Sequence, residues 1–348
     1  MKSIEWIDGR VRFLDQTLLP NEEQYIETDS IDVVAEAIRR LSLRGAPLIG
    51  IAAAYGIALG VRASRAKNGA EFLEALDEAC RLITSTRPTA KNLFWAAERM
   101  QAVARLHSQK QGKELAALLE EEALLIHRED EQMCAAMGAH GAALVPDEAV
   151  ILTHCNTGAL ATGGIGTALG VVITAHRQGR KVSVIADETR PLLQGARLTA
   201  WELKKEGIPV TLIPDTAAAV ALQKKRCSMV IVGSDRIAAN GDAANKIGTY
   251  GVAIMARHHG VPFYVAAPTS TFDCALESGD GIPIEERSPG EVTMIGPVRT
   301  APEGVDVFNP SFDVTPNELI AGIITEHGVL RPPYAESIRA MFTRRSAL

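Results

Sequence analysis

Hydrophobic and polar positions follow two different patterns along this chain of 348 residues, and the change lies near Pro146–Asp147. Before that point apolar residues recur mostly at the spacing of amphipathic helices. After it, short β-branched runs alternate with helical segments of roughly 10–15 residues. We therefore expect two domains, an N-terminal one of residues 1–145 and a C-terminal one of residues 146–348.

The N-terminal part begins with two runs that are typical of strands, IEWI and RVRFL. After them, Asp29–Ser30 can cap a helix that Gly45 ends, and Pro47 can begin the next helix. Three further helices are expected here: one that ends near Ser85, one that Pro88 begins, and one from about Glu114 towards His140. The pattern predicts a small domain of β pieces and helices.

Five short apolar runs in the C-terminal part are typical of parallel strands that are buried on both faces. They are AVILTH, KVSVIA, VTLI, MVIVGS and FYVAA. The helical segments between them indicate right-handed βαβ crossovers. The predicted fold class is therefore α/β, with a Rossmann-like parallel-sheet domain after the small N-terminal domain. Near the end, Thr315-Pro316-Asn317-Glu318 forms a capping box that predicts one more helix.

Composition and charge limit the kinds of partner and the cellular compartment that we expect for this protein. The net charge is −6 without a basic run, which argues against a nucleic-acid partner because phosphate contacts need a positive face. The 5 cysteines are scattered without a CxxC pair, as in proteins of a reduced cytosol. Charges interrupt the N-terminal MKSIEWIDGRVRFL, so we expect no signal peptide. The uncharged stretch Cys155–His176 predicts a strand, a loop and a buried helix rather than a membrane span, and we expect a cytoplasmic protein.

Polar residues follow the predicted strands, at the edge of a parallel sheet where ligands bind. Cys155 follows the first strand, Asp187 the second and Asp235 the fourth. Most cysteines are small buried hydrophobes, but the place of Cys155 before a Gly-rich loop also suits a catalytic thiol. A carboxylate at a buried strand end is desolvated, so the pKa of Asp235 should rise and it could act as a general acid. The alternatives for Asp235 are a helix N-cap and a structural ion pair.

Basic residues recur where helices are expected to begin, in the segments RGAP, TRPT and NK. Free backbone N–H groups and the helix dipole favour an anion at such positions. Arg44, Arg87 and Lys246 together therefore suggest a phosphate or another oxyanion as the ligand, although each alone could be an ordinary surface charge.

Cofactor motifs are weak or absent in the sequence. Gly164-Ile165-Gly166, with Asp187 at the next strand end, resembles a dinucleotide fingerprint. However, Leu169 takes the place of the third glycine, and the connection from the strand is too long. No GxxxxGK[ST] loop, HExxH motif or paired His/Cys spacing occurs. We expect no cofactor and no metal.

Several longer motifs carry a family resemblance from about residue 4 to about residue 335. They are RGAPLIGIAAAYG, TRPTAKNLFWA, THCNTGALATGGIGTALG, DETRPLLQGARLTAWEL, GSDRIAANGDAANKIGTYG, FYVAAPTSTFD and IPIEER. With these motifs the chain resembles the methylthioribose-1-phosphate isomerase family. That family shares its fold with regulatory subunits of a translation-initiation nucleotide exchange factor and with ribose-1,5-bisphosphate isomerases.

The resemblance implies an aldose–ketose isomerase that converts 5-methylthioribose 1-phosphate to 5-methylthioribulose 1-phosphate in methionine salvage. Asp235 matches the family's proton donor, and Cys155 matches its second catalytic position, assigned to transition-state stabilisation. The positions that match substrate-binding residues are Arg44, Gly45, Ala46, Arg87, Gln194, Asn245 and Lys246. The implied partner is a small phosphorylated sugar in a cleft between two domains. The family is typically homodimeric, so we expect a homodimer.

Two kinds of alternative function stay open at this point. A ribose-1,5-bisphosphate or 5-deoxyribose-1-phosphate isomerase would use the same chemistry, and a second cluster of Arg or Lys would favour the bisphosphate. A non-catalytic regulatory subunit of the exchange factor, with no small substrate, would not need Cys155 and Asp235, yet both are present.

Overall fold

The chain divides into two units in a computed structural model, which describes residues 2–64, 66, 69–110 and 112–345. The first unit contains the residues up to Ala135 together with Gly158–Gly166, and the second contains Ala136–Thr157 and the residues from Thr167 onward. The boundary predicted at residue 146 falls inside the second unit, between helix α5 (Gly112–Ala142) and strand β4 (Glu148–Thr153). The predicted limits place the end of α5 in the N-terminal domain, but it lies in the second unit. They place the loop 158–166 in the C-terminal domain, but it lies in the first unit.

The first unit begins with a three-stranded antiparallel sheet in the order β1-β2-β3. Its strands are β1 (Ile4–Ile7), β2 (Arg10–Leu14) and β3 (Tyr25–Thr28). Ile4 lies opposite Phe13, and both side chains are buried in the core of this unit. The first two strands confirm the predicted runs. The third was missed because YIET is too short to show a clear alternation.

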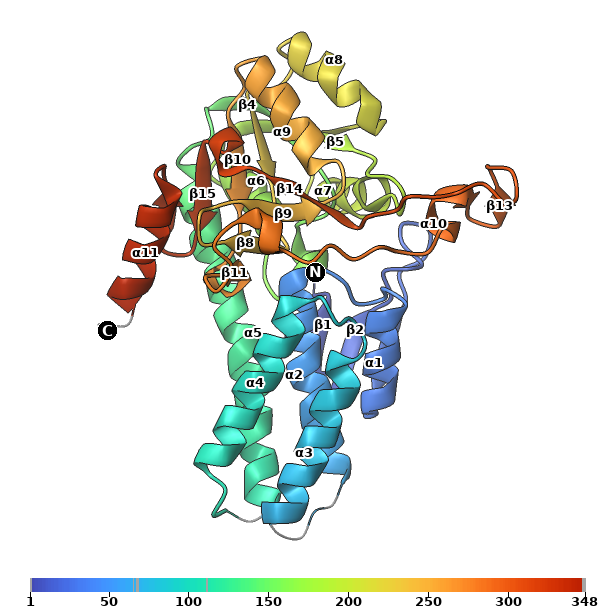
Figure 1. Cartoon of the computed structure of the whole chain (residues 1–348), viewed down its shortest axis with the longest axis vertical. Coiled ribbons are helices and arrows are strands. Elements are labelled where there is room, and N and C mark those ends of the chain that lie inside the picture. The colour runs from blue at the N-terminus through green and yellow to red at the C-terminus, as the bar shows by residue number, and fades with distance from the viewer. Residues whose placement is uncertain (1, 65, 67–68, 111, 346–348) are drawn as a thin grey trace. The chain divides into compact units, whose positions relative to one another are not determined.

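Helix α2 forms the centre of the first unit. The helices of the first unit are α1 (Ile31–Arg39), α2 (Ala46–Ala63), α3 (Gly69–Thr84), α4 (Lys91–Leu106) and most of α5. Helix α2 packs against α1, α3 and α4, and Figure 1 shows these helices running side by side. Among the described helices, only α2 is long and apolar enough to cross a membrane, and 78% of it is buried inside the protein. Such burial is typical of the core helix of a folded unit.

The loop between α1 and α2 differs from the prediction. Leu41 has a φ of 65°, and this left-handed backbone ends α1 at Arg39, well before Gly45. Gly45 instead lies directly before α2, with a φ of 96°. A Cβ atom there would also lie 2.6 Å from Cα of Ala161, so both the backbone and the space require glycine. Ser30 is the N-cap residue of α1, but its side chain makes no capping hydrogen bond.

The second unit is built on a seven-stranded sheet in the order β16-β15-β10-β7-β4-β5-β6. Its other strands are β5 (Lys181–Asp187), β6 (Val210–Ile213), β7 (Met229–Val232), β10 (Phe263–Ala266), β15 (Gly322–Thr325) and β16 (Gly328–Leu330). All neighbours pair in parallel except the edge strand β16. Strands β4, β5, β6, β7 and β10 are the five predicted ones, so the mixed α/β class with a parallel sheet is confirmed.

The order of the parallel strands contains a reversal. Numbered along the chain, they lie as 3-2-1-4-5-6, with β4 as the first and β7 as the fourth. In open α/β sheets, ligands bind in the crevice beyond the carboxyl ends of the strands where the winding direction reverses. Here that point lies between β4 and β7, so the residues after these two strands are candidates for a functional site.

Helices and smaller sheets complete the second unit. The α-helices are α6 (Ala168–Arg177), α7 (Ala200–Lys205), α8 (Ala218–Gln223), α9 (Thr249–His258), α10 (Gly290–Thr293) and α11 (Tyr334–Arg345). A four-stranded sheet in the order β11-β8-β9-β14 contains β8 (Arg236–Ala238), β9 (Ala243–Lys246), β11 (Phe272–Asp273) and β14 (Phe312–Thr315). Strands β12 (Met294–Ile295) and β13 (Val298–Arg299) form a hairpin. The stretch Cys155–His176 holds a loop and the buried helix α6, as predicted.

The helix predicted after Thr315 is wrong. Thr315 is the last residue of β14 and lies opposite Ala243 of β9. Only a single turn of 3-10 helix, Asn317–Leu319, follows it, without a side-chain cap. Pairing of β14 with β9 fixes Thr315 in an extended conformation, and this tertiary contact overrides the local capping signal.

Candidate active site

Cys155 and Asp235 follow neighbouring strands at the point where the winding of the sheet reverses. Strands β4 and β7 pair in parallel, with Leu152 opposite Val230. Cys155 comes two residues after the end of β4, and Asp235 lies between β7 and β8. The structure therefore brings the chain segments of the two predicted catalytic residues to the same edge of the same sheet.

Two threonine hydroxyls fix the backbone of Cys155. The Cys155 N–H donates a hydrogen bond to Oγ1 of Thr189 at 2.8 Å, and the hydroxyl of Thr199 donates to the Cys155 carbonyl at 2.6 Å. Cys155 itself has a φ of 66°, a left-handed conformation that is rare for residues with a side chain. Strain of this kind clusters at functional sites when the surroundings over-determine it, as these two hydrogen bonds do here.

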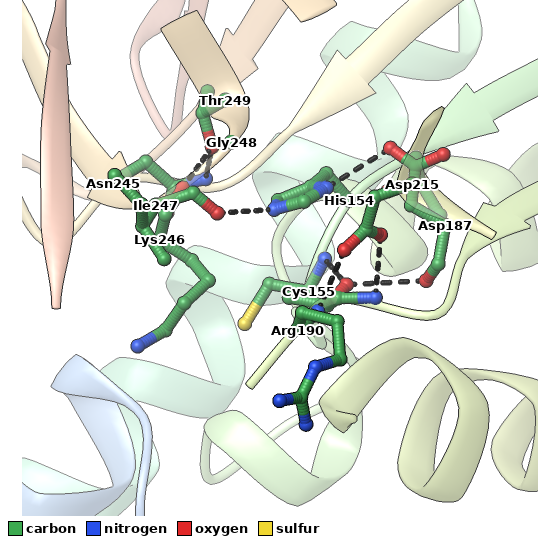
Figure 2. A network of polar contacts seen from close by, with 12 residues as sticks. His154, Cys155, Asp187, Arg190, Asp215, Asn245, Lys246, Ile247, Gly248 and Thr249 are labelled. Atoms are coloured by element: carbon green, nitrogen blue, oxygen red, sulfur yellow. Dashed lines mark hydrogen bonds and ion pairs between the residues drawn. The ribbon is translucent and has the colours of Figure 1, made fainter. Parts of the chain in front are cut away.

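A second layer of contacts fixes the loop that holds Thr189. Both oxygens of the Asp215 carboxylate accept backbone N–H groups, from Thr189 and from Arg190, each at 2.7 Å. Figure 2 shows the thiol of Cys155 on the side of the Lys246 side chain, away from this backbone anchor. Sequence reasoning missed Thr189, Thr199 and Asp215 because they act through backbone contacts that no short motif encodes.

The other cysteines differ from Cys155, which is half-buried. Cys80, Cys134 and Cys227 are buried, and burial raises the pKa of Cys80 to about 12 and that of Cys227 to about 11. Burial of this kind keeps a thiol protonated and unreactive, so these three are structural cysteines. Cys274 is exposed and is not a core residue.

Asp235 lies in an extended segment rather than at the start of a helix. Its N–H donates to the carbonyl of Ala244 at 2.9 Å, and β8 begins with the next residue. The alternative interpretation as a helix N-cap is therefore wrong. The side chain is half-buried, so its removal from water is only partial, and its role as a general acid stays a prediction.

Gln194 is buried and offers an oxygen without a partner. It lies directly before a short π-helix, Gly195–Thr199, and only 7% of its surface is exposed. Among the described residues, no group donates a hydrogen bond to Oε1 of Gln194. A buried polar atom without a partner is costly, which favours a ligand hydroxyl or amine at this position.

Asn245 and Lys246 are the last residues of β9, and both are buried. The Asn245 amide donates to Oγ1 of Thr249 at 3.0 Å, and Nζ of Lys246 lies 5.1 Å from the centre of the Phe312 ring. Another side chain of the protein occupies part of the predicted anion site at the start of the following helix. The carboxylate of Asp313 already accepts the N–H groups of residues 248 and 250, at 2.7 and 3.0 Å. The prediction that Lys246 contacts an anionic ligand therefore depends mainly on its own charge.

The remaining predicted binding residues belong to the first unit. Arg44 is buried, Gly45 is the N-cap residue of α2 and Ala46 is its first residue. Arg87 is half-buried in the turn between α3 and α4, where its carbonyl accepts the N–H of Ala90 at 3.1 Å. Helix α4 begins only at Lys91, so Arg87 lies in a turn and not at the helix start that we predicted.

The described residues contain a cluster of metal-ligand type, formed by His154, Asp187 and Asp215. Both ring nitrogens of His154 are used, by Asp187 at 2.9 Å and by the Ile247 carbonyl at 2.8 Å. Asp215 holds two backbone N–H groups with both oxygens. The cluster is therefore a hydrogen-bond network within the protein. The dinucleotide-like Gly164–Gly166 lies in the part of the loop that belongs to the first unit, and not in a tight turn from β4 into α6.

The chain matches known proteins along nearly its whole length. Residues 42–332 match the model of the Initiation factor 2 subunit family. The methylthioribose-1-phosphate isomerase of Syntrophotalea carbinolica is 56% identical over 98% of this chain and 99% of its own length. A protein of Moorella thermoacetica named 5-deoxyribose 1-phosphate isomerase is 53% identical over 99% of this chain and 98% of its own length.

Two solved structures of known proteins are similar to this chain over nearly its whole length. The 5-methylthioribose 1-phosphate isomerase from Pyrococcus horikoshii has a TM-score of 0.92 and 46% identity, with 98% of this chain and 96% of that chain covered. A structure from A. fulgidus described as translation initiation factor eIF-2B, subunit delta, has a TM-score of 0.88 and 44% identity, with 99% of both chains covered. These two proteins therefore share the mixed α/β fold of this chain.

Proposed function

We propose that this chain is an aldose–ketose isomerase of methionine salvage. It belongs to the Initiation factor 2 subunit family, and it resembles the methylthioribose-1-phosphate isomerases of that family along nearly its whole length. It converts 5-methylthioribose 1-phosphate to 5-methylthioribulose 1-phosphate. The observation that carries this proposal is the placement of Cys155 and Asp235 after neighbouring parallel strands at the reversal of the sheet.

The reaction has an obstacle that explains why an acid is needed. The anomeric carbon carries the phosphate, so the sugar ring cannot open freely to an aldehyde. The carboxyl group of Asp235 donates a proton to the ring oxygen as the bond between this oxygen and C1 breaks, and hydrogen moves from C2 to C1. The C2 hydroxyl loses its proton as C2 becomes the ketone carbon, and the Asp235 carboxylate accepts this proton, which restores the acid. Cys155, held by Thr189 and Thr199, stabilises the transition state from a fixed position.

The substrate contacts follow from the charges and partners of the binding residues. Lys246 binds the phosphate through its positive charge. The family resemblance adds Arg44, Arg87, Gly45 and Ala46 of the first unit as further substrate contacts, and the last two lie at the start of α2, where free N–H groups favour an anion. Oε1 of Gln194 accepts a hydrogen bond from a sugar hydroxyl, which gives this buried oxygen its partner. Asn245 donates or accepts a further sugar contact. No cofactor is needed for these steps.

Two further properties stay predictions of the sequence and the family resemblance. We propose that the protein works as a homodimer in the cytoplasm. The 5 cysteines, scattered without a CxxC pair, support the compartment. Sedimentation of the purified chain tests the assembly, and a monomer at micromolar concentration would contradict it.

Relatives suggest a second substrate, because the Moorella thermoacetica protein is named for 5-deoxyribose 1-phosphate. The decisive assay compares three sugars with the purified chain: 5-methylthioribose 1-phosphate, 5-deoxyribose 1-phosphate and ribose 1,5-bisphosphate. We expect the highest kcat/KM with the first sugar. A higher value with the bisphosphate would identify the alternative isomerase. No turnover of any of the three would favour the non-catalytic role suggested by the A. fulgidus structure's description.

The role of Asp235 has its own test. Asp235→Asn keeps the shape of the side chain but removes the acid, so turnover should be abolished while substrate still binds. Calorimetric titration with 5-methylthioribose 1-phosphate shows whether binding survives. Turnover near the wild-type rate would refute the assignment.

A further inference from the structure

Directly before Cys155, a histidine and an aspartate form a buried pair. His154 follows β4, Asp187 ends β5, and their side chains are 1% and 0% exposed. Nδ1 of His154 lies 2.9 Å from Oδ2 of Asp187, and Nε2 lies 2.8 Å from the carbonyl of Ile247. Figure 2 shows the imidazole between these two partners. The ring thus links the end of β4 to the end of β5 and to the loop that follows β9.

The partners of the ring decide how many protons it holds. A backbone carbonyl only accepts hydrogen bonds, so Nε2 must carry a proton toward Ile247. The short contact between Nδ1 and Oδ2 of Asp187 needs a second proton. If that proton were lost, two lone pairs would face each other in a buried site, or the bond to Ile247 would break.

The charged groups around His154 favour the protonated ring. Asp187 on β5, Asp215 after β6 and Asp313 on β14 all place carboxylates toward it, and Glu188 lies beside Asp187. Burial alone would lower the pKa of His154. The hydrogen bond and the charge of Asp187, with the charge of Asp215, outweigh burial and raise this pKa. Burial also raises the pKa of Asp187, so both partners of this contact favour keeping the proton between them.

The ring also packs tightly against the loop that follows Lys246. Ile247 comes directly after Lys246, and Gly248 has a φ of 104°. A Cβ atom on Gly248 would lie 2.8 Å from Cε1 of His154, so the backbone of this loop rests on the imidazole. Movement of the ring would displace the loop on one side and the end of β4 on the other.

We propose that His154 and Asp187 share one buried proton and act as positioning residues, which hold Cys155 in a fixed position relative to Asn245 and Lys246. The effect on catalysis rests on the proposed isomerase function, because it acts through residues assigned by that function. The proton-sharing itself does not, since it follows from the contacts of the ring alone.

The first test reads the proton directly and needs no substrate. Histidine-selective ¹⁵N NMR of the full chain should show a ring with two N–H protons at pH 7.5, and this signal should be absent in His154→Gln. A His154 ring with a single N–H proton at that pH would overturn the proposal.

The second test separates a positioning role from a purely structural one. His154→Gln keeps a donor near Ile247 but loses Asp187, and Asp187→Ala loses the shared proton and the contact. In both, kcat should fall at least about tenfold in the folded protein, because small displacements of catalytic groups slow the reaction. Asp187→Asn can still donate to a neutral ring, so it should recover part of that loss. His140→Gln is a matched control, since His140 also bonds a carbonyl, that of Thr325, and its kcat should stay unchanged.

Each outcome decides between the hypotheses. Wild-type kcat in both His154→Gln and Asp187→Ala, with only a lower melting temperature, would overturn the positioning role. Where His154→Gln does not fold, Asp187→Asn and Asp187→Ala still give the comparison. If the wild-type chain turns over none of the sugars, the proposed function fails, whereas the NMR result still decides whether the proton is shared.

Discussion

Thr199 fixes the carbonyl of Cys155, so its hydroxyl should control both stability and turnover. Thr199 is fully buried, and its hydroxyl donates to that carbonyl at 2.6 Å. Thr199→Val keeps the shape of the side chain and removes the donor. A buried acceptor left without its partner costs about 1–3 kcal/mol, and the contact is only partly buried, so we expect the lower half of that range.

The same substitution releases strain at Cys155. The left-handed conformation is less stable by about 1–2 kcal/mol for a residue with a side chain. Without the Thr199 hydroxyl, only the hydrogen bond from the Cys155 N–H to Thr189 still holds Cys155 at its φ of 66°. The thiol should then move, and kcat should fall more than KM rises.

Thermal unfolding and steady-state kinetics check this prediction together. The melting temperature should fall by about 2–4 °C for each kcal/mol lost. Thr199→Ser keeps the hydroxyl and serves as the control, with kcat close to that of the wild type. A Thr199→Val protein with wild-type kcat and melting temperature would refute the reasoning.

Three other predictions concern separate parts of the chain. Cys155→Ala should lower kcat far more than it weakens binding of 5-methylthioribose 1-phosphate, and a pure loss of affinity would indicate a structural cysteine. Gly45→Ala should lower the melting temperature more than Gly207→Ala does. Both positions have a positive φ, but only at Gly45 would a Cβ atom meet another residue, Ala161 at 2.6 Å, within 4 Å. Burial lowers the pKa of His127 below its ordinary 6.5, so the unfolded chain binds that proton more readily and stability should fall as the pH drops below 6.5. His127→Gln should reduce this fall in a pH series of melting curves, and an unchanged pH dependence would contradict it.

The sequence pattern predicts the parallel sheet well because each of its first five strands is a short run rich in aliphatic and β-branched residues, although the edge strand β6 is partly exposed and not buried on both faces as predicted. Since ligands bind beyond the carboxyl ends of such strands, the same pattern identifies Cys155 and Asp235 as candidates without a structure. It also finds Asp187, although its part in holding His154 becomes visible only from the distance between their side chains.

Contacts between distant segments account for most of what the sequence could not predict. Thr315 has the residues of a capping box, yet pairing with β9 makes it part of a strand. The start of α9 looks like an anion site until Asp313, far along the chain, fills it with a carboxylate. Thr189 and Thr199 are ordinary threonines in any local pattern, and only the fold brings both to the backbone of Cys155.

The most direct test of the central claim follows the substrate itself. 5-Methylthioribose 1-phosphate labelled with ¹³C at C2 is incubated with the purified chain, and ¹³C NMR records the labelled carbon. We predict that the C2 signal moves to the region of a ketone carbonyl with the wild type and stays in place with Asp235→Asn. A labelled carbon that stays an alcohol carbon with the wild type would contradict the isomerase account.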